Sequence, residues 1–340
     1  MMRLRNLLSM MAIALVCTTI QAKDYPYETV AGDLMQARIY KLDNGLTVYL
    51  SVNKEKPRIQ TYIAVRTGSK NDPAETTGLA HYLEHLMFKG TDKFGVTDPE
   101  AEKPYLDEIQ ARYEEYRQIS DPELRRRKYH EIDSVSQLAA QYFIPNEYDK
   151  LMSAIGAEGT NAYTSNDVTC YTEDIPSNEV DNWAKIQADR FQHMVIRGFH
   201  TELEAVYEEY NIGIAQDQRK IFEAMSAKLF PTHPYGTQTT IGTQEHLKNP
   251  SITNIKNYFH NYYCPNNVAI CMAGDFNSDE VIEILERHFG NWKPNYNLTR
   301  PEFAPLQPIT APIDTTVMGQ EAEFVALGWR FGAGNTLPCD

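Results

Sequence analysis

The 340-residue sequence has few cysteines, no Cys-x-x-Cys pair, no internal repeat and no low-complexity tract. Without Cys-x-x-Cys spacing, neither a thiolate zinc site nor thioredoxin-like redox chemistry has support. The cysteines follow no regular spacing, and we interpret the four beyond the N-terminal stretch as structural residues: Cys170, Cys264, Cys271 and Cys339. With 42% hydrophobic and 23% charged residues, the composition indicates a globular protein.

A long apolar run is also missing. The most apolar stretch, residues 7–20, spans only 14 residues, whereas a membrane-crossing helix needs about 20. Two arginines precede this stretch and Ala22 offers a small residue for cleavage, so residues 1–22 are typical of a secretory signal peptide. Cys17 could instead carry a lipid, although the residues before it fit that signal poorly. We therefore expect an exported protein, periplasmic or secreted, without a transmembrane segment.

Positive charge is scarce. Cleavage after residue 22 removes two arginines and no acidic residue, so 30 basic and 46 acidic residues leave a net charge of −16. Nucleic acids and anionic lipids both repel an acidic protein, so neither is expected as a partner. The negative net charge would help a protein attract basic peptides, but a need for solubility would explain the charge equally well.

Strand-like and helix-like stretches alternate between residues 27 and 292. Strands are expected at residues 46–50, 59–65, 168–171 and 268–272, and helices at residues 182–195, 202–229 and 279–289. Strands that are separated by helices and spaced unevenly predict an α+β fold, in which a mixed sheet carries helices on one face.

Residues 99–146 predict a helical hairpin inserted on the domain surface. On either side of an Asp-Pro break, apolar and aromatic residues recur at three- and four-residue spacing: Leu106, Ile109, Tyr113 and Tyr116, then Ile132, Val135, Leu138 and Tyr142. One apolar seam of this kind is typical of two antiparallel helices. We interpret the many charges of this segment as a solvated face rather than a grip on a substrate or partner.

The C-terminal part differs in composition. Five prolines fall within residues 294–312, which predicts a linker. Beyond it, residues 321–331 predict a strand, and a single strand cannot bury its own face. We therefore expect a main domain over residues 23–293, the linker over residues 294–312, and the start of a truncated second domain over residues 313–340.

Residues 78–91, GLAHYLEHLMFKGT, carry the strongest functional signal. Apolar residues at helical spacing predict a helix here, and His81 and His85 are four residues apart on one face of it. The two histidines can therefore share a metal ion, and Glu84 can reach a water on that metal. The order His-x-x-Glu-His is the inverse of the commoner zinc-hydrolase motif. For an isolated motif, a solvated helix face would be the alternative interpretation.

A catalytic zinc site normally has three protein ligands and one open position. The third ligand should be a carboxylate on another element, and the best candidate segment is residues 201–211, TELEAVYEEYN. Glu202 and Glu209 are seven residues apart and so share a helix face. Glu208 is the alternative ligand if the register differs by one residue, and Glu204 is interpreted as a surface residue.

The motif and its flanks, Gly78 before it and Phe88-Lys89-Gly90-Thr91 after it, closely resemble the signature of the pitrilysin/insulinase metallopeptidases, which are inverzincins. The resemblance covers about residues 27–292. It implies a two-layer α/β sandwich that occurs in duplicated halves, with residues 23–293 as the catalytic domain. It also implies one Zn²⁺ per chain, held by His81, His85 and Glu209, with Glu202 as a supporting acid.

Residues 159–164, followed by a strand, resemble the edge strand of the same family, on which an extended peptide adds by main-chain pairing. Asn161 and Ala162 would then bind substrate. The implied function is an exported zinc-dependent metalloendopeptidase that hydrolyses peptides or unfolded polypeptides. In this mechanism Glu84 takes a proton from zinc-bound water and later passes it to the leaving amine.

The resemblance also implies a second lobe, because the second half of the family fold supplies an Arg/Tyr pair near the scissile bond. The sequence contains only what resembles the start of such a half. A homologous subunit, a second copy of the chain, or the continuation of a truncated chain would complete the enzyme. The alternative function is a zinc-binding but inactive half-enzyme that needs a partner subunit.

Overall fold

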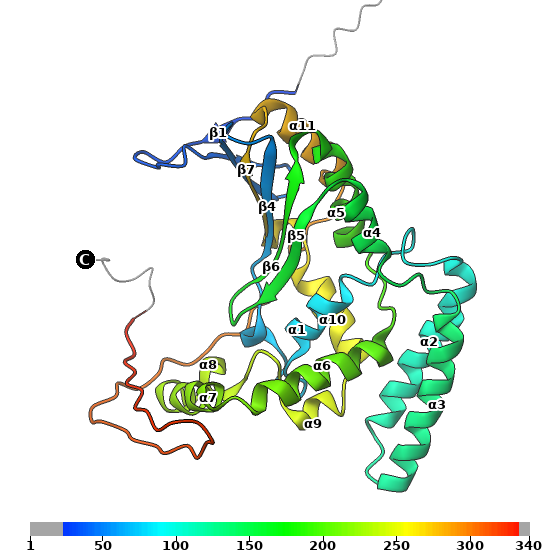
Figure 1. Ribbon diagram of the computed structural model, residues 1–340, viewed down its shortest axis with the longest axis vertical. Helices are drawn as coiled ribbons and strands as arrows, with labels where there is room; N and C mark the ends of the chain where they lie inside the picture. Colours follow the sequence, from blue (N-terminus) through cyan, green and yellow to red (C-terminus); the bar gives the residue numbers. More distant parts are fainter. Residues whose placement is uncertain (1–22, 333–340) are drawn as a thin grey trace, which may run out of the picture.

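The computed structural model describes residues 23–332. One mixed sheet forms a layer with the strand order β1-β2-β3-β7-β4-β6-β5 (Figure 1). Strands β3 and β7 run parallel, and the other neighbouring strands run antiparallel. The bounds of the strands are β1 Tyr27–Glu28, β2 Arg38–Lys41, β3 Thr47–Val52, β4 Arg58–Val65, β5 Glu158–Thr164, β6 Thr169–Pro176 and β7 Val268–Gly274.

The sheet has one buried face and one open face. On the central strand β4, Ile59, Ile63 and Val65 are fully buried, whereas Tyr62 between them is 39% exposed. Successive strand side chains point to opposite faces, so this alternation leaves one face for helices to cover. Helices α5 and α11 cover that face, and the predicted two-layer α+β fold is confirmed.

Helices α5 and α11 pack on each other against the sheet, while α1, α6 and α10 gather at one end of it (Figure 1). The bounds of the helices are α1 Leu79–Leu86, α2 Pro99–Tyr116, α3 Pro122–Ala140, α4 Glu147–Ala154, α5 Val180–His193, α6 Phe199–Ile214, α7 Asp217–Leu229, α8 Pro234–Thr237, α9 Gln244–Leu247, α10 Ile252–Tyr262 and α11 Ser278–Phe289.

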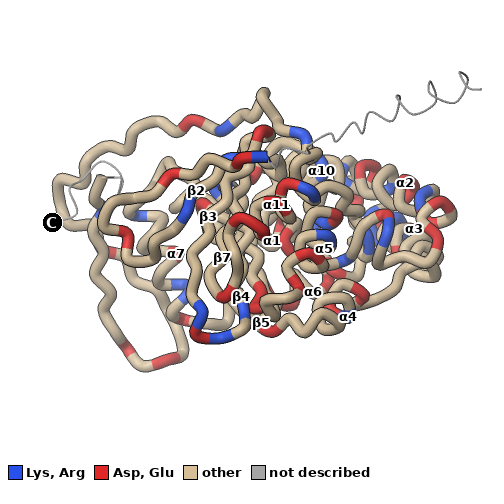
Figure 2. The backbone as a smooth tube through the Cα atoms, turned by 90° about the horizontal axis from the view of Figure 1, so that it is seen from above, with Lys and Arg blue, Asp and Glu red and all other residues tan. Residues whose placement is uncertain are grey.

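Helices α2 and α3 form the predicted hairpin. Asp98 and Asp121 cap their N-termini, and a proline follows each cap at the first helical position, where its missing N–H costs nothing. The seam between the helices is apolar as expected, except that Ala139 is buried in it while Leu138 is 44% exposed. Residues of both charge signs are spread along the hairpin (Figure 2).

The helix expected over residues 202–229 is in fact two helices. Helix α6 ends at Ile214 and α7 begins at Asp217, so the chain turns at Ala215 and Gln216. Gln216 has extended backbone angles, which end the helical path. The guanidinium of Arg219 packs closely over Gly213, where a larger residue would collide with it. This bend allows α7 to form a wall beside α6.

The prediction of a strand over residues 321–331 is wrong, because residues 322–332 form no regular secondary structure. The segment lies along α7 instead of beside a strand. The buried carboxylate of Asp217 accepts the backbone N–H groups of Gln320 and Glu321, and Arg330 donates to the carbonyl of Leu229. A strand forms only where a neighbour takes its backbone groups, and here a side chain takes them.

Predictions about the chain ends fall partly outside the described residues. The expected signal peptide, residues 1–22, and Cys339 both lie there. Within residues 23–332, Cys170, Cys264 and Cys271 are free thiols. No helix in the same range combines the length and the apolar character needed to cross a membrane.

Helix α1, which carries the His-x-x-Glu-His motif, has only eight residues and begins after Gly78 in a left-handed conformation (φ +87°). Gly78 has no side chain to cap the helix, and the buried carboxylate of Asp72 takes over this task. It accepts the backbone N–H groups of Gly78, Leu79 and Ala80 at 2.8, 3.2 and 3.0 Å. One side chain thus satisfies most of the free N–H groups at this end of the helix.

We predict that Asp72→Ala lowers the free energy of unfolding by about 2 kcal/mol, because three buried amides lose their acceptor. Urea denaturation followed by circular dichroism measures the change. Asp121→Ala removes a cap at the exposed N-terminus of α3 and should cost about 0.5–1 kcal/mol. Equal losses in the two variants would contradict the role given to Asp72.

Candidate metal centre and active site

Helix α1 has one face buried in the core and another that carries the two histidines. Leu79, Leu83 and Leu86 are buried in the core and hold α1 in place. His81 and His85 lie one turn apart, with ring centroids 4.7 Å from each other. Packing of the leucines therefore turns both imidazoles toward α6.

Helix α6 brings Glu209 opposite these rings. Its Oε2 atom lies 3.7 Å from Nε2 of His81 and 3.5 Å from Nε2 of His85. Within residues 23–332, these three side chains form the one group of histidine, cysteine or acidic residues spaced to hold a metal ion. Donor atoms that share a tetrahedral zinc ion lie about 3.4 Å apart, so the set fits zinc. The Glu209 side chain is 51% exposed, which leaves one side of the group open.

Glu208, the alternative metal ligand considered from the sequence, lies on another side of α6. It lines a groove between α6 and the α2–α3 hairpin together with Glu204. Both residues are exposed. Geometry thus favours Glu209 over Glu208 as a ligand, in the register that the sequence favoured.

Glu202 lies behind the metal group. Its Oε1 is 2.8 Å from Nδ1 of His85, and its Oε2 is 2.5 Å from Nζ of Lys89. A carboxylate only accepts, so Nδ1 of His85 is the donor and Nε2 carries the free lone pair toward Glu209. Burial opposes the charge of Glu202, but the hydrogen bonds from His85 and Lys89 outweigh burial and lower the pKa of Glu202. Burial likewise opposes protonation of His85, and the bond to Glu202 still raises the pKa of this histidine.

His81 has a different environment. Burial, with the charges of His85 and Arg219, lowers the pKa of His81 to about 4, so its imidazole is neutral near pH 7. Its Nδ1 atom is buried without a hydrogen-bond partner among the described residues. A neutral imidazole is the form that binds metal ions.

Glu84, on the same helix, is only 7% exposed. Burial raises the pKa of its carboxyl group, while the hydroxyl of Thr164 donates to Oε2 at 2.5 Å and works against that shift. Thr164 is the last residue of β5, so the carboxyl group of Glu84 lies beside the edge strand.

A cleft of about 740 Å³ contains the two histidines, Glu84 and Glu209. Strand β5 lines one side with Asn161 and Ala162, and α7 lines the other with Arg219, Phe222 and Glu223. Strand β5 pairs with β6 on one side and ends the strand order of the sheet, so its other edge faces the cleft. Every residue predicted from the sequence for catalysis, metal or substrate binding, apart from Glu202, therefore lines this cleft.

The chain segment around Ile241 forms a further wall of the cleft. Gly78 and Gly242 meet there backbone to backbone, and a side chain at either would collide with the other segment. At the opposite end of α1, Gly90 (φ +106°) and Gly95 meet in the same way. The glycines of the GLAHYLEHLMFKGT run thus mark places where the backbone needs close approach.

Sequence reasoning missed Lys89, Thr164 and Arg219 as members of the site. Lys89 had a signal, because it belongs to the motif run and lies three residues after the end of α1. Thr164 and Arg219 had none, since their places depend on β5 and on the bend between α6 and α7. His233, set aside as structural, accepts the backbone N–H of Tyr235 and caps α8.

Two family sequence patterns match the chain. The one described as Insulinase (Peptidase family M16) matches residues 47–101, which include His81, Glu84 and His85. The one described as Peptidase M16 inactive domain matches residues 251–338. The chain belongs to the pitrilysin/insulinase family.

A curated relative, the uncharacterised zinc protease YmxG of Bacillus subtilis, is 23% identical over 269 residues, which cover 78% of this chain and 53% of that protein. The first half of the periplasmic protease PqqL from Escherichia coli has a TM-score of 0.60 at 16% identity, over 82% of this chain and 50% of the other. Pitrilysin has a TM-score of 0.57 at 20% identity, over 86% of this chain and 26% of the other. The chain thus spans about half the length of YmxG.

We predict that Glu209→Gln weakens zinc binding at least about 100-fold, because the amide is a much poorer ligand than the carboxylate. Glu202→Gln should weaken zinc binding about 10-fold through its bond to His85. Competition with a chromophoric chelator measures both affinities. Glu208→Gln is the matched control and should leave the affinity unchanged; a larger effect there than at Glu209 would overturn the ligand assignment.

Proposed function

We propose that this chain is the catalytic part of an exported zinc-dependent endopeptidase. The observation that carries the proposal is the meeting of His81, His85 and Glu209 at the bottom of a cleft, with Glu84 between the two histidines in sequence and beside the edge strand in space. The family membership and the zinc-protease names of relatives support the same chemistry.

His81, His85 and Glu209 would hold one zinc ion, and Glu202 would orient His85 through Nδ1. When bound, zinc acts as a Lewis acid that lowers the pKa of water and polarises a peptide carbonyl. Glu84 would accept the proton of the attacking water at its carboxylate and return it to the nitrogen of the leaving amine. Thr164 would keep the carboxylate of Glu84 turned toward the cleft by donating to Oε2.

The proposed substrate is an extended peptide or an unfolded polypeptide. The free edge of β5 offers unpaired backbone groups along the cleft, and a peptide can add to such an edge as a further strand. Asn161 and Ala162 would pair with the substrate main chain there. Folded proteins do not present a free strand of this kind, so chain flexibility would select the substrate.

A second lobe would complete the cavity, supplied by a homologous subunit, a second copy of the chain or a longer form of the chain. The match to about half the length of YmxG, and to half of the first half of PqqL, supports this part of the proposal. The same coverage favours a second candidate function, a zinc-binding half-enzyme that is inactive without its partner. Export rests on the N-terminal sequence and on the periplasmic origin of PqqL.

The test is hydrolysis of a quenched-fluorescence peptide mixture by the chain that begins at Lys23, with zinc content measured on the same sample. We predict that Glu84→Gln keeps one zinc per chain but lowers turnover at least about 100-fold, because the general base is lost. Glu204→Gln, a change on the opposite side of α6, should retain full turnover.

Normal cleavage by the Glu84→Gln variant would refute the base assignment. One bound zinc per chain without any cleavage by the parent protein would favour the half-enzyme. Absence of zinc binding in the parent protein would refute both functions.

A further inference from the structure

Two buried arginines lie just beyond the C-terminal end of the motif helix. The exposed fraction is 0% for Arg190 and 1% for Arg197. Arg190 belongs to α5, and its Nε donates to the carbonyl of Met87 at 2.9 Å. Arg197 donates to the carbonyls of Lys89 and Thr91, each at 3.2 Å. Buried arginines are rare because the charge loses its hydration, so their placement here needs an explanation.

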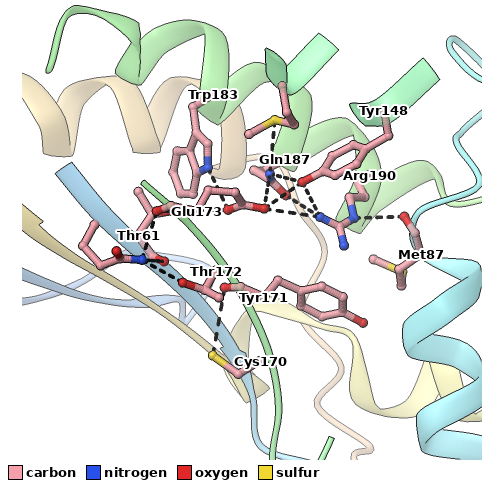
Figure 3. A network of polar contacts seen from close by, with 12 residues as sticks. Thr61, Met87, Tyr148, Cys170, Tyr171, Thr172, Glu173, Trp183, Gln187 and Arg190 are labelled. Carbon is pink, nitrogen blue, oxygen red and sulfur yellow. Dashed lines mark hydrogen bonds and ion pairs between the residues drawn. The ribbon is translucent and has the colours of Figure 1, made fainter. Parts of the chain in front are cut away.

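Arg190 is held in a closed cluster (Figure 3). Its guanidinium lies 4.4 Å from the ring centroids of Phe88, Tyr148 and Tyr171, and Nη1 donates to the hydroxyl of Tyr148 at 2.7 Å. The carboxylate of Glu173, also fully buried, lies 3.8 Å from Nη1. The rings and the carboxylate together fix both the position and the plane of the guanidinium.

Glu173 has other donors besides Arg190. Its carboxylate accepts from Tyr148 at 2.7 Å and from Trp183 and Thr61 at 3.2 Å each. Glu173 lies on β6, the neighbour of the edge strand β5. Arg190 thus connects the end of α1 to β6, the strand that pairs with the edge strand β5.

The position of Met87 makes this link relevant to the site. Met87 follows His85 by two residues and Glu84 by three, so a shift of its carbonyl moves the turn that carries both. The last carbonyls of a helix lack partners within the helix, and a cation there also suits the helix dipole. Asp72 holds the first turn of α1 and Arg190 holds the last, with the motif between them.

We propose that Arg190 is a positioning residue of the candidate centre, which holds the end of α1 against β6 and thereby sets where Glu84 and His85 lie relative to Glu209 and the edge strand. This inference rests on the proposed function. Reacting groups must be held within about 0.5 Å, and a displacement of about 1 Å can lower a rate about 100-fold. A helix of eight residues needs such an external hold, since it is too short to keep its shape alone.

The test compares Glu173→Gln with the double variant Arg190→Met/Glu173→Gln. The first change removes the charge of Glu173 but leaves the bond from Arg190 to Met87. The double variant also removes the bond from Arg190 to Met87, and it leaves no buried charge unpaired. The two variants therefore differ from each other in the hydrogen bond to α1. Thermal unfolding establishes that each is folded at the assay temperature.

We expect Glu173→Gln to lie between the parent and the double variant in zinc affinity and kcat, because it loses the ion pair to β6 but keeps the bond from Arg190 to Met87. The double variant should show about 10-fold weaker zinc binding, an altered visible spectrum of the Co²⁺-substituted protein, and kcat about 100-fold lower. KM should change less than about threefold, because the edge of β5 is untouched. A merely structural role would not alter the cobalt spectrum or separate kcat from KM in folded protein.

Equal zinc affinity, cobalt spectrum and kcat in the two variants would overturn the proposal. If the double variant does not fold, Arg190→Lys replaces it. Lysine keeps the charge but cannot donate to Met87 and Tyr148 in the same plane. Unchanged zinc affinity and an unchanged cobalt spectrum in Arg190→Lys would also overturn the proposal. Failure of the parent protein to bind zinc would refute the proposed function instead, while zinc binding without cleavage leaves the affinity and the spectrum as the deciding readouts.

Discussion

The helix that carries His81, Glu84 and His85 is too short to be stable in water, so the whole centre depends on the contacts that keep α1 helical. These contacts come from outside the helix, from seven residues before it to more than 100 residues after it. A carboxylate satisfies the amides at its first turn, a guanidinium satisfies a carbonyl at its last turn, and the leucine side packs into the core. The carboxyl oxygens of Asp72 face the N-terminal amides, and the cation of Arg190 has the sign that the helix dipole favours at the C-terminal end.

Three glutamates of the site have the same side chain and three different environments. Glu84 is enclosed and bonded to a hydroxyl, Glu202 accepts hydrogen bonds from His85 and Lys89, and Glu209 is half open to the cleft. The first environment raises the pKa of a carboxyl group and the second lowers it. Separation of this kind is what lets identical carboxylates take distinct parts in acid–base chemistry.

Local sequence patterns made part of the fold and part of the candidate site predictable. The spacing of His81, Glu84 and His85 within one helix needs no knowledge of the fold. The order of strand-like and helix-like stretches predicted a mixed sheet with helices on one face. Glu209 was proposed as the third ligand because that ligand should lie on another element, and its register came from family resemblance. The division of the chain into a main domain with an inserted hairpin, a linker and the start of a second domain stays a prediction.

The rest depends on contacts that the sequence does not reveal. Asp72 and Arg190 act on α1 across 8 and 103 positions of sequence, so no window around the motif contains both. The break at Ala215 and Gln216 lies inside a stretch with helical composition. Residues 321–331 have strand-like alternation, yet Asp217 binds their first amides and leaves no partner strand. Tertiary contacts overrode local preference at both places.

The paired glycines at the start of α1 have a consequence for how the cleft can change. Gly78 and Gly242 touch through their backbones, and the adjacent Ile241 lines the cleft. The cleft wall at Ile241 and the helix that carries the motif therefore behave as one body, with no side chain between them to absorb a displacement. A change of shape in this wall would carry His81 and His85 with it, so the cleft can change shape independently of the motif helix only at its other walls, β5 and α7.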